Sequence, residues 1–265
     1  MNRHIRSLPC LILCIGIFIE SIQAFATPQL TGREIMIQVD QAEDGDDRKS
    51  HMEMILTNHR GKTRIRKIAT AAKDYGPDVK KIMVFQKPLD VKGTAFLTWE
   101  YDNMERDDDK WLYMPALRKV RRISGKSNND YFMGSDFTYD DMGDRSVDED
   151  THTLLEEVEI QGIACWKIQS TPVTDDVNYT KRLLWVNKAA RTIIRAEYFD
   201  AQGLIKTFTV EDLRLHQGFW TVFAMRMVNH RENHTTDLKI LDMAYDTGIS
   251  DTIFKVAAVS RGKLR

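Results

Sequence analysis

Cysteine, proline and glycine are scarce in this sequence, whose 265 residues include 3 Cys, 6 Pro and 14 Gly. So little glycine and proline, together with 9% aromatic residues, excludes a collagen-like, low-complexity or generally disordered chain. Basic charge is not in excess either, because 38 Lys and Arg stand against 39 Asp and Glu. Proteins that bind nucleic acids normally carry a basic excess, so we expect no nucleic-acid partner.

Long hydrophobic runs are absent except near the start of the chain. A short basic region there precedes an apolar run over residues 8–19, and Ala24-Phe25-Ala26 follows it. This is the pattern of a cleavable secretory signal, and the run is too short for a membrane span of about 20 residues. We therefore predict a cleaved signal peptide at residues 1–26 and a single domain at residues 27–265. An uncleaved anchor is the alternative.

Cleavage would leave 239 residues, a net charge of −2 and one cysteine, Cys165. A single thiol cannot form an intrachain disulfide, whereas eukaryotic extracellular domains usually contain paired cysteines. The composition therefore favours a periplasmic protein of a bacterium. Cys165 lies in an apolar strand pattern, and we expect it to be a buried, unreactive thiol.

Most of the remaining chain has the residue pattern of β-strands. Met52, Met54 and Leu56 alternate with more polar residues, and similar segments recur to give about ten or eleven antiparallel strands. Helices are expected only at residues 31–41, which open with a capping box, and at residues 250–259. Because several strands are apolar on both faces, the sheet must cover one face, either by curving around a partly filled apolar interior or by forming a two-sheet sandwich.

Motifs for catalysis are missing or incomplete. The chain has no G-x-S-x-G nucleophile elbow and no Gly-rich phosphate loop, so we predict no enzyme activity, no catalytic residues, no metal and no cofactor. His230, Glu232 and His234 would share one face of a strand, where a solvated turn competes with a weak metal site. Groups of acidic residues could serve a hydrolase or bind calcium, but we interpret them as solvated loops. They lie at residues 43–47, 107–109, 140–144 and 148–150.

The densest basic stretch contains Arg118, Lys119, Arg121 and Arg122. Arginine side chains are well suited to carboxylate and phosphate groups. Two interpretations stay open for this stretch. It is either a solvated strand paired with an acidic loop, or a contact for a lipid head group, a membrane surface or an acidic partner.

A family resemblance lies in five runs of the sequence. They are FQKP at residues 85–88, VKGTAFL at 91–97, DKWLYMPALR at 109–118, VRRI at 120–123 and FMGSDFTYDDM at 132–142. Together these runs closely resemble bacterial outer-membrane lipoprotein-sorting proteins, a branch of the LolA/LolB-like superfamily.

The resemblance implies a mainly β fold, a half-open, unclosed antiparallel barrel of about eleven strands with a few helices covering its mouth. It also implies a monomeric periplasmic carrier that transfers lipid or lipoprotein acyl chains towards the outer membrane. An inner-membrane transporter and an outer-membrane acceptor would then be its partners. Members of this branch often resemble partners of resistance-nodulation-division exporters, so an accessory subunit of such an exporter is the alternative function.

The predicted ligand cavity is taken from the apolar faces of the strands. Methionine suits adaptable apolar surfaces, so Met52 and Met54 are the strongest candidates, and a place in the structural core is the competing role for every residue of the set. The helix at residues 31–41 and the loop at residues 124–134 are the candidate movable lids. The full set of predicted cavity residues is Met52, Met54, Leu56, Phe96, Trp99, Trp111, Tyr113, Phe137, Phe208, Phe223 and Met225.

Overall fold

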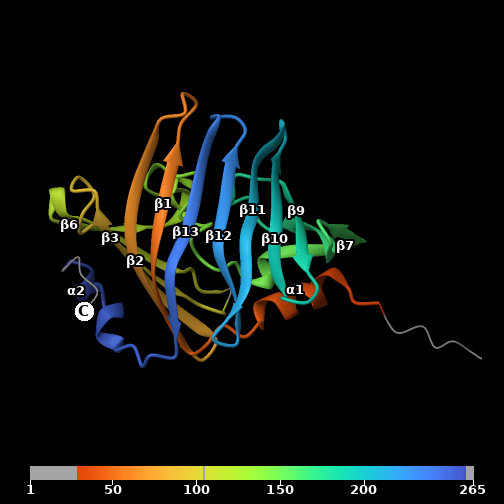
Figure 1. Cartoon of the computed structure of the whole chain (residues 1–265), viewed down its shortest axis with the longest axis horizontal. Helices are drawn as coiled ribbons and strands as arrows, with labels where there is room; N and C mark the ends of the chain where they lie inside the picture. The colour runs from red at the N-terminus through yellow and green to blue at the C-terminus, as the bar shows by residue number, and fades with distance from the viewer. Residues whose placement is uncertain (1–28, 104, 261–265) are drawn as a thin grey trace, which may run out of the picture.

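The structure is a computed structural model that describes residues 29–103 and 105–260. The predicted signal peptide lies outside this part of the chain. Thirteen strands form one sheet, which is two more than the eleven expected (Figure 1). The short strand β6 (Lys119–Ile123) is easily missed in the sequence, because all its residues except Ile123 are exposed and it has no apolar alternation.

The strands fall into two consecutive groups. Before β6 come β1 (Asp47–Thr57), β2 (Thr63–Tyr75), β3 (Asp78–Lys87), β4 (Ala95–Glu100) and β5 (Asp109–Met114). After it come β7 (Asp150–Ile160), β8 (Ile163–Pro172), β9 (Lys181–Asn187), β10 (Thr192–Asp200), β11 (Gly203–His216), β12 (Phe219–Asn229) and β13 (His234–Tyr245).

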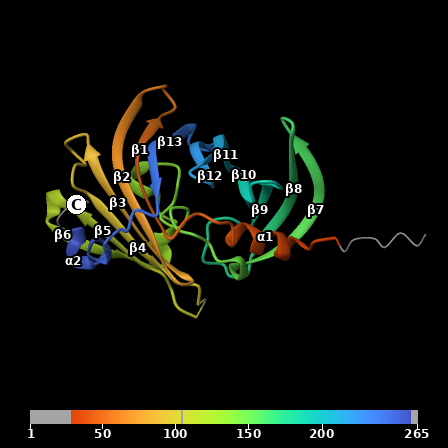
Figure 2. The same ribbon diagram turned by 60° about the horizontal axis from the view of Figure 1, so that its bottom comes forward.

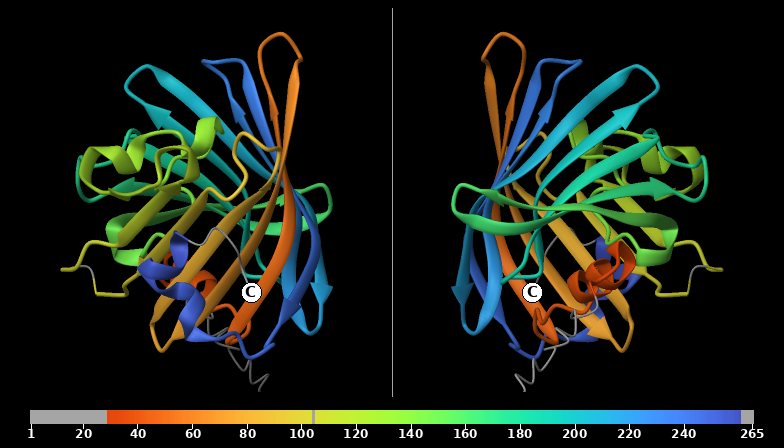
Figure 3. Two further views of the ribbon diagram at one scale, coloured as in Figure 1. Left: turned by 90° about the vertical axis from the view of Figure 1, so that its left-hand side faces the viewer. Right: turned by 90° about the vertical axis from the view of Figure 1, so that its right-hand side faces the viewer.

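Within β1 to β6 and within β7 to β13, each strand pairs antiparallel with its neighbours in sequence, and β1 also pairs with β13 to join these two sets. The resulting order is β6-β5-β4-β3-β2-β1-β13-β12-β11-β10-β9-β8-β7. The edge strands β6 and β7 do not pair with each other, so the sheet is open and not closed into a barrel. It curves strongly into a trough, with the early strands as one wall and the strands from β7 to β10 as the other (Figures 2 and 3).

The chain passes from one edge of the sheet to the other through residues 124–149, which we call the crossing segment. It contains the 3₁₀ turns η2 (Gly125–Asn129), η3 (Phe132–Gly134) and η4 (Val147–Glu149), while η1 (Pro115–Leu117) forms the β5–β6 turn. Because its aromatic residues belong to the same apolar cluster as side chains of β1, β4 and β9, the crossing segment lies on the concave side of the sheet.

Helix α1 (Gly32–Asp40) confirms the predicted capping box. The Thr31 hydroxyl accepts a hydrogen bond from the Glu34 N–H at 3.2 Å, and the Glu34 carboxylate accepts one from the Thr31 N–H at 2.7 Å. The helix packs beside β7 at the lower opening of the trough (Figure 2). None of the helices in the described ranges has the length and apolar character needed to cross a membrane.

The prediction of one continuous C-terminal helix is wrong. Residues 250–259 form two short pieces, η5 (Asp251–Phe254) and α2 (Val256–Val259), separated by extended Lys255. Phe254 and Val259 are both buried in a second apolar cluster on the convex face of β2 to β5. In one continuous helix they would point about 140° apart, so the break lets both face the sheet.

Candidate functional site

The concave face of the sheet carries a contiguous apolar surface. Side chains from β1, β2, β3, β4, β5, β8, β9, β12 and β13 contribute to it, and Ile35 and Met36 of helix α1 join it from the opening. It is the larger of two apolar clusters in the described residues, and it spans almost every strand of the sheet. An apolar face of this extent is suited to burying a hydrocarbon chain.

Several predicted cavity residues do lie on this face. Met52, Met54 and Leu56 of β1 are buried in the cluster, and so is Phe96 of β4. Phe137 belongs to the crossing segment and meets Phe208 of β11 edge to face at 6.5 Å, while Met225 of β12 packs at the margin. Phe223 is buried further along β12, where its ring meets His216 at 5.4 Å and the Arg214 guanidinium at 3.8 Å.

Trp99, Trp111 and Tyr113 lie on the opposite face, which corrects their assignment to the same cavity. They pack in the convex cluster, where the Trp99 indole N–H donates to the Phe254 carbonyl oxygen at 2.8 Å. The reason is the two-residue period of a strand: Trp99 is three residues from Phe96, so the two side chains point to opposite faces. By the same rule the concave residue of β5 is Leu112, which lies in the concave cluster.

Aromatic residues of the crossing segment fill the middle of the concave face. Phe132 is fully buried, with ring centroids 6.0 Å from Phe85, 5.2 Å from Phe96 and 5.4 Å from Tyr139. Phe132 of the predicted lid at residues 124–134 is therefore packed inside the trough, whereas the other residues of that lid are exposed or half-buried. The space that an acyl chain would need is occupied by the protein's own side chains.

Aspartates of the crossing segment and of β7 tie it to the surrounding strands. The Asp136 carboxylate accepts from the Thr236 hydroxyl at 2.7 Å and pairs with the His234 imidazole at 2.7 Å. Asp141 pairs with Lys206 of β11, and Asp144 lies 2.6 Å from the ammonium group of Lys81 in β3. The same ammonium group lies 2.8 Å from buried Glu100, whose pKa is raised by burial.

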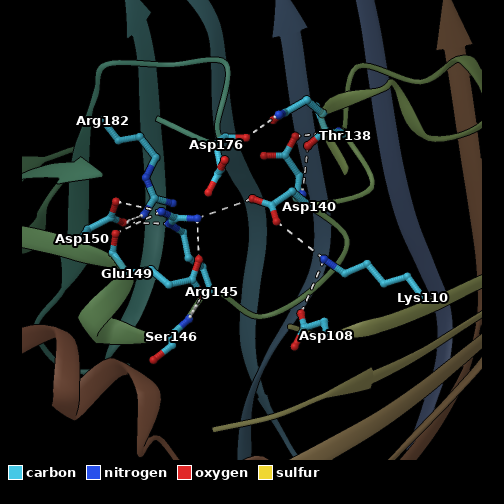
Figure 4. A network of polar contacts seen from close by, with 12 residues as sticks. Asp108, Lys110, Thr138, Asp140, Arg145, Ser146, Glu149, Asp150, Asp176 and Arg182 are labelled. Carbon is cyan, nitrogen blue, oxygen red and sulfur yellow. Dashed lines mark hydrogen bonds and ion pairs between the residues drawn. The ribbon is translucent and has the colours of Figure 1, made fainter. Parts of the chain in front are cut away.

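A cluster of ionic contacts surrounds Asp150, at the start of β7 (Figure 4). Its carboxylate is paired with Arg182 of β9 and lies 3.0 Å from Nε of Arg145. Burial opposes the charge of Asp150, but the two guanidinium groups outweigh it and lower the pKa of this carboxyl. Arg145 also reaches Asp140 at 3.6 Å, and Asp140 lies 3.6 Å from Lys110 of β5, so the network links both walls of the trough.

These contacts correct the interpretation of the acidic groups as solvated loops for part of their members, whereas Glu43, Asp107 and Asp148 are exposed as expected. Asp136, Asp150 and the β1 residue Asp47 are buried, and Asp140 and Asp141 are partly buried. Apart from Arg145, their partners lie far away in the sequence, so local spacing could not predict these contacts. The one available signal was the number of Lys and Arg residues inside otherwise apolar strands, such as Lys110 and Lys206, which need a counter-charge when buried.

A small cavity of about 100 Å³, which we call the polar cavity because most residues that line it are of polar types, lies between the crossing segment and strands β10 and β11. Asp140, Asp141, Lys206, Tyr179 and Tyr198 all line it. Asn129, Tyr131, Thr138, Asn178 and Ile205 complete its lining. Because Tyr198 also belongs to the apolar cluster, the polar cavity adjoins the apolar surface.

Helix α1 is held on β7 by close backbone packing and by one exposed ion pair. A Cβ atom on Gly32 would lie 2.8 Å from the backbone of His152 and of Leu154. The Arg33 guanidinium lies 2.9 Å from the Asp148 carboxylate of η4. The helix thus rests on η4 at the end of the crossing segment, outside the predicted lid at residues 124–134.

The other predicted residues have separate positions. Arg118, Lys119, Arg121 and Arg122 are exposed on the β5–β6 turn and β6. Arg122 pairs with Asp109, which agrees with a strand paired to an acidic loop, and Arg121 donates to the Ser127 hydroxyl at 3.2 Å. Cys165 is buried as expected, and burial raises the pKa of its thiol.

His230 and His234 do not face a common site. The Nε2 atom of His230 lies 2.8 Å from the hydroxyl of Thr207, whereas His234 pairs with Asp136. Within residues 29–103 and 105–260, no group of three or more His, Cys, Asp or Glu side chains is arranged to hold a metal ion.

Comparison with known proteins identifies relatives of the whole domain. A family model described as "-like: Uncharacterized protein" matches residues 77–261. A DUF1329 family protein from Desulfovibrio piger is 34% identical, covering 86% of this chain and 97% of its own with a TM-score of 0.82. The chain belongs to the DUF1329 family.

Two further structures resemble this DUF1329 protein. A domain from Vibrio parahaemolyticus named for outer membrane lipoprotein sorting is 30% identical, with a TM-score of 0.81 over 87% of this chain and 98% of its own. A LolA superfamily protein from Nitrosomonas europaea has a TM-score of 0.67 at 19% identity, over 86% and 99% of the two chains, which supports the LolA-like fold. These matches confirm the resemblance seen in the sequence. No curated protein matches the chain.

Proposed function

We propose that this DUF1329 protein is a periplasmic carrier that binds a lipid or a lipoprotein acyl chain in its trough and delivers it towards the outer membrane. The observation that supports this proposal is the apolar surface on the concave face of an open sheet, which continues over nearly all strands. The relative from Vibrio parahaemolyticus, named for lipoprotein sorting, adds support. Signal cleavage after Ala26 would deliver the protein to the periplasm.

Loading requires the crossing segment to leave the trough. Phe132, Phe137 and Tyr139 occupy the apolar surface, and each gains about 1.5–3 kcal/mol from burial. An acyl chain with about 14 methylene groups gains roughly 11 kcal/mol when it leaves water, at about 0.8 kcal/mol for each group. One chain therefore exceeds the total of about 4.5–9 kcal/mol from the three displaced aromatic side chains by a few kcal/mol, and additional chains favour the loaded state further. This small surplus suits a carrier that must also release its cargo.

The polar cavity beside the apolar surface suits the head of an amphipathic cargo. The acyl chain would lie along the concave face, and the polar end would reach Lys206, Tyr179 and Asp140 at the cavity. Phenol, carboxylate and ammonium groups offer both donors and acceptors of hydrogen bonds there. The arrangement favours carriage of a whole lipid over storage of a hydrocarbon.

Native mass spectrometry and lipid extraction of the protein purified from a producing cell test the proposal. We expect a bound lipid, and we expect a photoreactive fatty acid to attach to concave residues such as Met54 and Met36. Trp99 and Trp111, on the convex face, serve as internal controls. Absence of bound lipid together with no uptake of a fluorescent fatty acid, or attachment mainly at the convex face, would contradict carriage in the trough.

A further inference from the structure

Two exposed leucines mark one end of the sheet, on turns that lie side by side. Leu89 in the β3–β4 loop is 85% exposed, and Leu117 in the β5–β6 turn is 59% exposed. The turns are adjacent, because a Cβ atom on Gly93 of the first would lie 3.3 Å from Pro115 of the second. Single exposed leucines are common on protein surfaces, but here two stand at neighbouring tips.

Basic residues surround the two leucines. Lys87, Lys92, Arg118 and Lys119 are all exposed, and no carboxylate of the described residues lies within 4.0 Å of their charged nitrogens. Asp90 is the one acidic residue in the same two turns. This part of the molecule is therefore positively charged, although the chain as a whole has a net charge of −1.

The opposite end of the same strands is acidic. The β4–β5 loop contains Asp102, Glu105 and Asp107, all exposed. Strands β3, β4 and β5 thus run between a basic end with apolar tips and an acidic end. In the field of a negatively charged surface, such a charge distribution turns the basic end towards that surface.

We propose that the turns at residues 87–92 and 115–119 dock the protein on an anionic phospholipid membrane. The leucines would enter the interface between head groups and acyl chains, while the four cations contact lipid phosphates. An acidic protein partner fits less well, because a stable protein interface needs about 800 Å² on each side, whereas these turns present narrow tips. The proposal concerns the outer surface and does not depend on cargo in the trough.

Binding of the whole chain to vesicles of phosphatidylcholine, with and without phosphatidylglycerol, tests this docking. Residues 8–19 are themselves apolar, so the informative quantity is the difference between variants in the same chain. We expect the double variant Leu89→Ser/Leu117→Ser to bind anionic vesicles at least tenfold more weakly than the wild type. Arg118→Gln should reduce binding roughly fivefold at low salt. Leu241→Ser, at a leucine 53% exposed on β13, is the matched control and should bind like the wild type.

Chemical footprinting gives a local measurement. Anionic vesicles should protect Lys87, Lys92 and Lys119 from acetylation, while exposed Lys239 on β13 remains reactive. Equal protection of all four lysines, or equal vesicle binding by the wild type and the leucine double variant, would overturn the proposal. Protection of the same lysines by an acidic protein but not by vesicles would also overturn it, in favour of a protein partner.

Discussion

Phe132 offers the most direct test of whether the crossing segment blocks the trough. Its side chain is fully buried at the centre of the concave cluster and contacts Phe85, Phe96 and Tyr139. The variant Phe132→Ala removes the largest single contact of the segment without touching its ionic anchors. We expect this variant to be less stable and to bind acyl chains more tightly.

Both effects have magnitudes that follow from burial. A buried Phe→Ala substitution costs about 3–5 kcal/mol, which for a domain of this size lowers Tm by roughly 6–20 °C. Native domains are stable by about 5–15 kcal/mol, so most of the variant stays folded. A cargo chain would no longer displace the phenyl ring, which saves about 1.5–3 kcal/mol and raises affinity roughly ten- to a hundredfold.

The assay combines thermal unfolding with titration of a fluorescent fatty acid. Phe254→Ala is the matched control, because Phe254 is almost equally buried but belongs to η5 and packs on the convex face. It should lower Tm by a similar amount and leave the affinity unchanged. If the two variants bind the fatty acid equally, or if Phe132→Ala leaves Tm unchanged, the crossing segment does not occupy the binding surface.

Three further predictions concern helix α1, its neighbour strand β7 and the C-terminal segment. Alanine is a better helix former than glycine, yet Gly32→Ala should speed amide exchange over residues 32–40. The reason is that the Cβ atom of the alanine would lie 2.8 Å from the backbone of His152. Unchanged exchange would contradict this packing. Burial lowers the pKa of His152, so the folded protein favours the neutral imidazole. The free energy of unfolding should therefore fall as pH drops below about 6.5, where the unfolded chain takes up a proton and the folded chain does not. In chemical unfolding curves, His152→Gln should remove this part of the pH dependence. Asp47 accepts hydrogen bonds from the N–H groups of residues 247–249 at 2.8, 2.8 and 2.9 Å, so Asp47→Asn should cost about 3 kcal/mol and expose the C-terminal segment to protease. Burial opposes the charge of Asp47, but these N–H groups outweigh it and lower the pKa of the carboxyl. The wild-type chain should therefore lose this stabilisation only as pH falls below about 4. An Asp47→Asn variant as stable as the wild type at pH 7 would refute the role.

Local patterns predicted local structure well. The alternation of Met52, Met54 and Leu56 placed β1 and its concave side, and Thr31 with Glu34 placed the start of helix α1. Both depend on residues within one strand or one helical turn. The error at Trp99 arose because the side-chain period of β4 was not applied to an aromatic residue, although the sequence contained that information.

The positions of the acidic residues could not be predicted in this way. Asp150 is buried between Arg145 and Arg182, and Asp141 pairs with Lys206, 65 residues away. A polar run between two strands has the same sequence pattern whether it lies in water or crosses a protein interior. Only the burial of basic partners on distant strands distinguishes the two cases.

By itself, the sequence determined the mainly β fold, the capped first helix and the resemblance to lipoprotein-sorting proteins, because these depend on local periodicity and on contiguous motifs. The tertiary structure decided which face of the sheet each side chain covers and brought the crossing segment into the trough. It also placed Leu89 beside Leu117 at one basic end. These features depend on the curvature of a single sheet in which β1 and β13, the first and last strands of the chain, pair in the middle. That pairing joins residues nearly 200 positions apart.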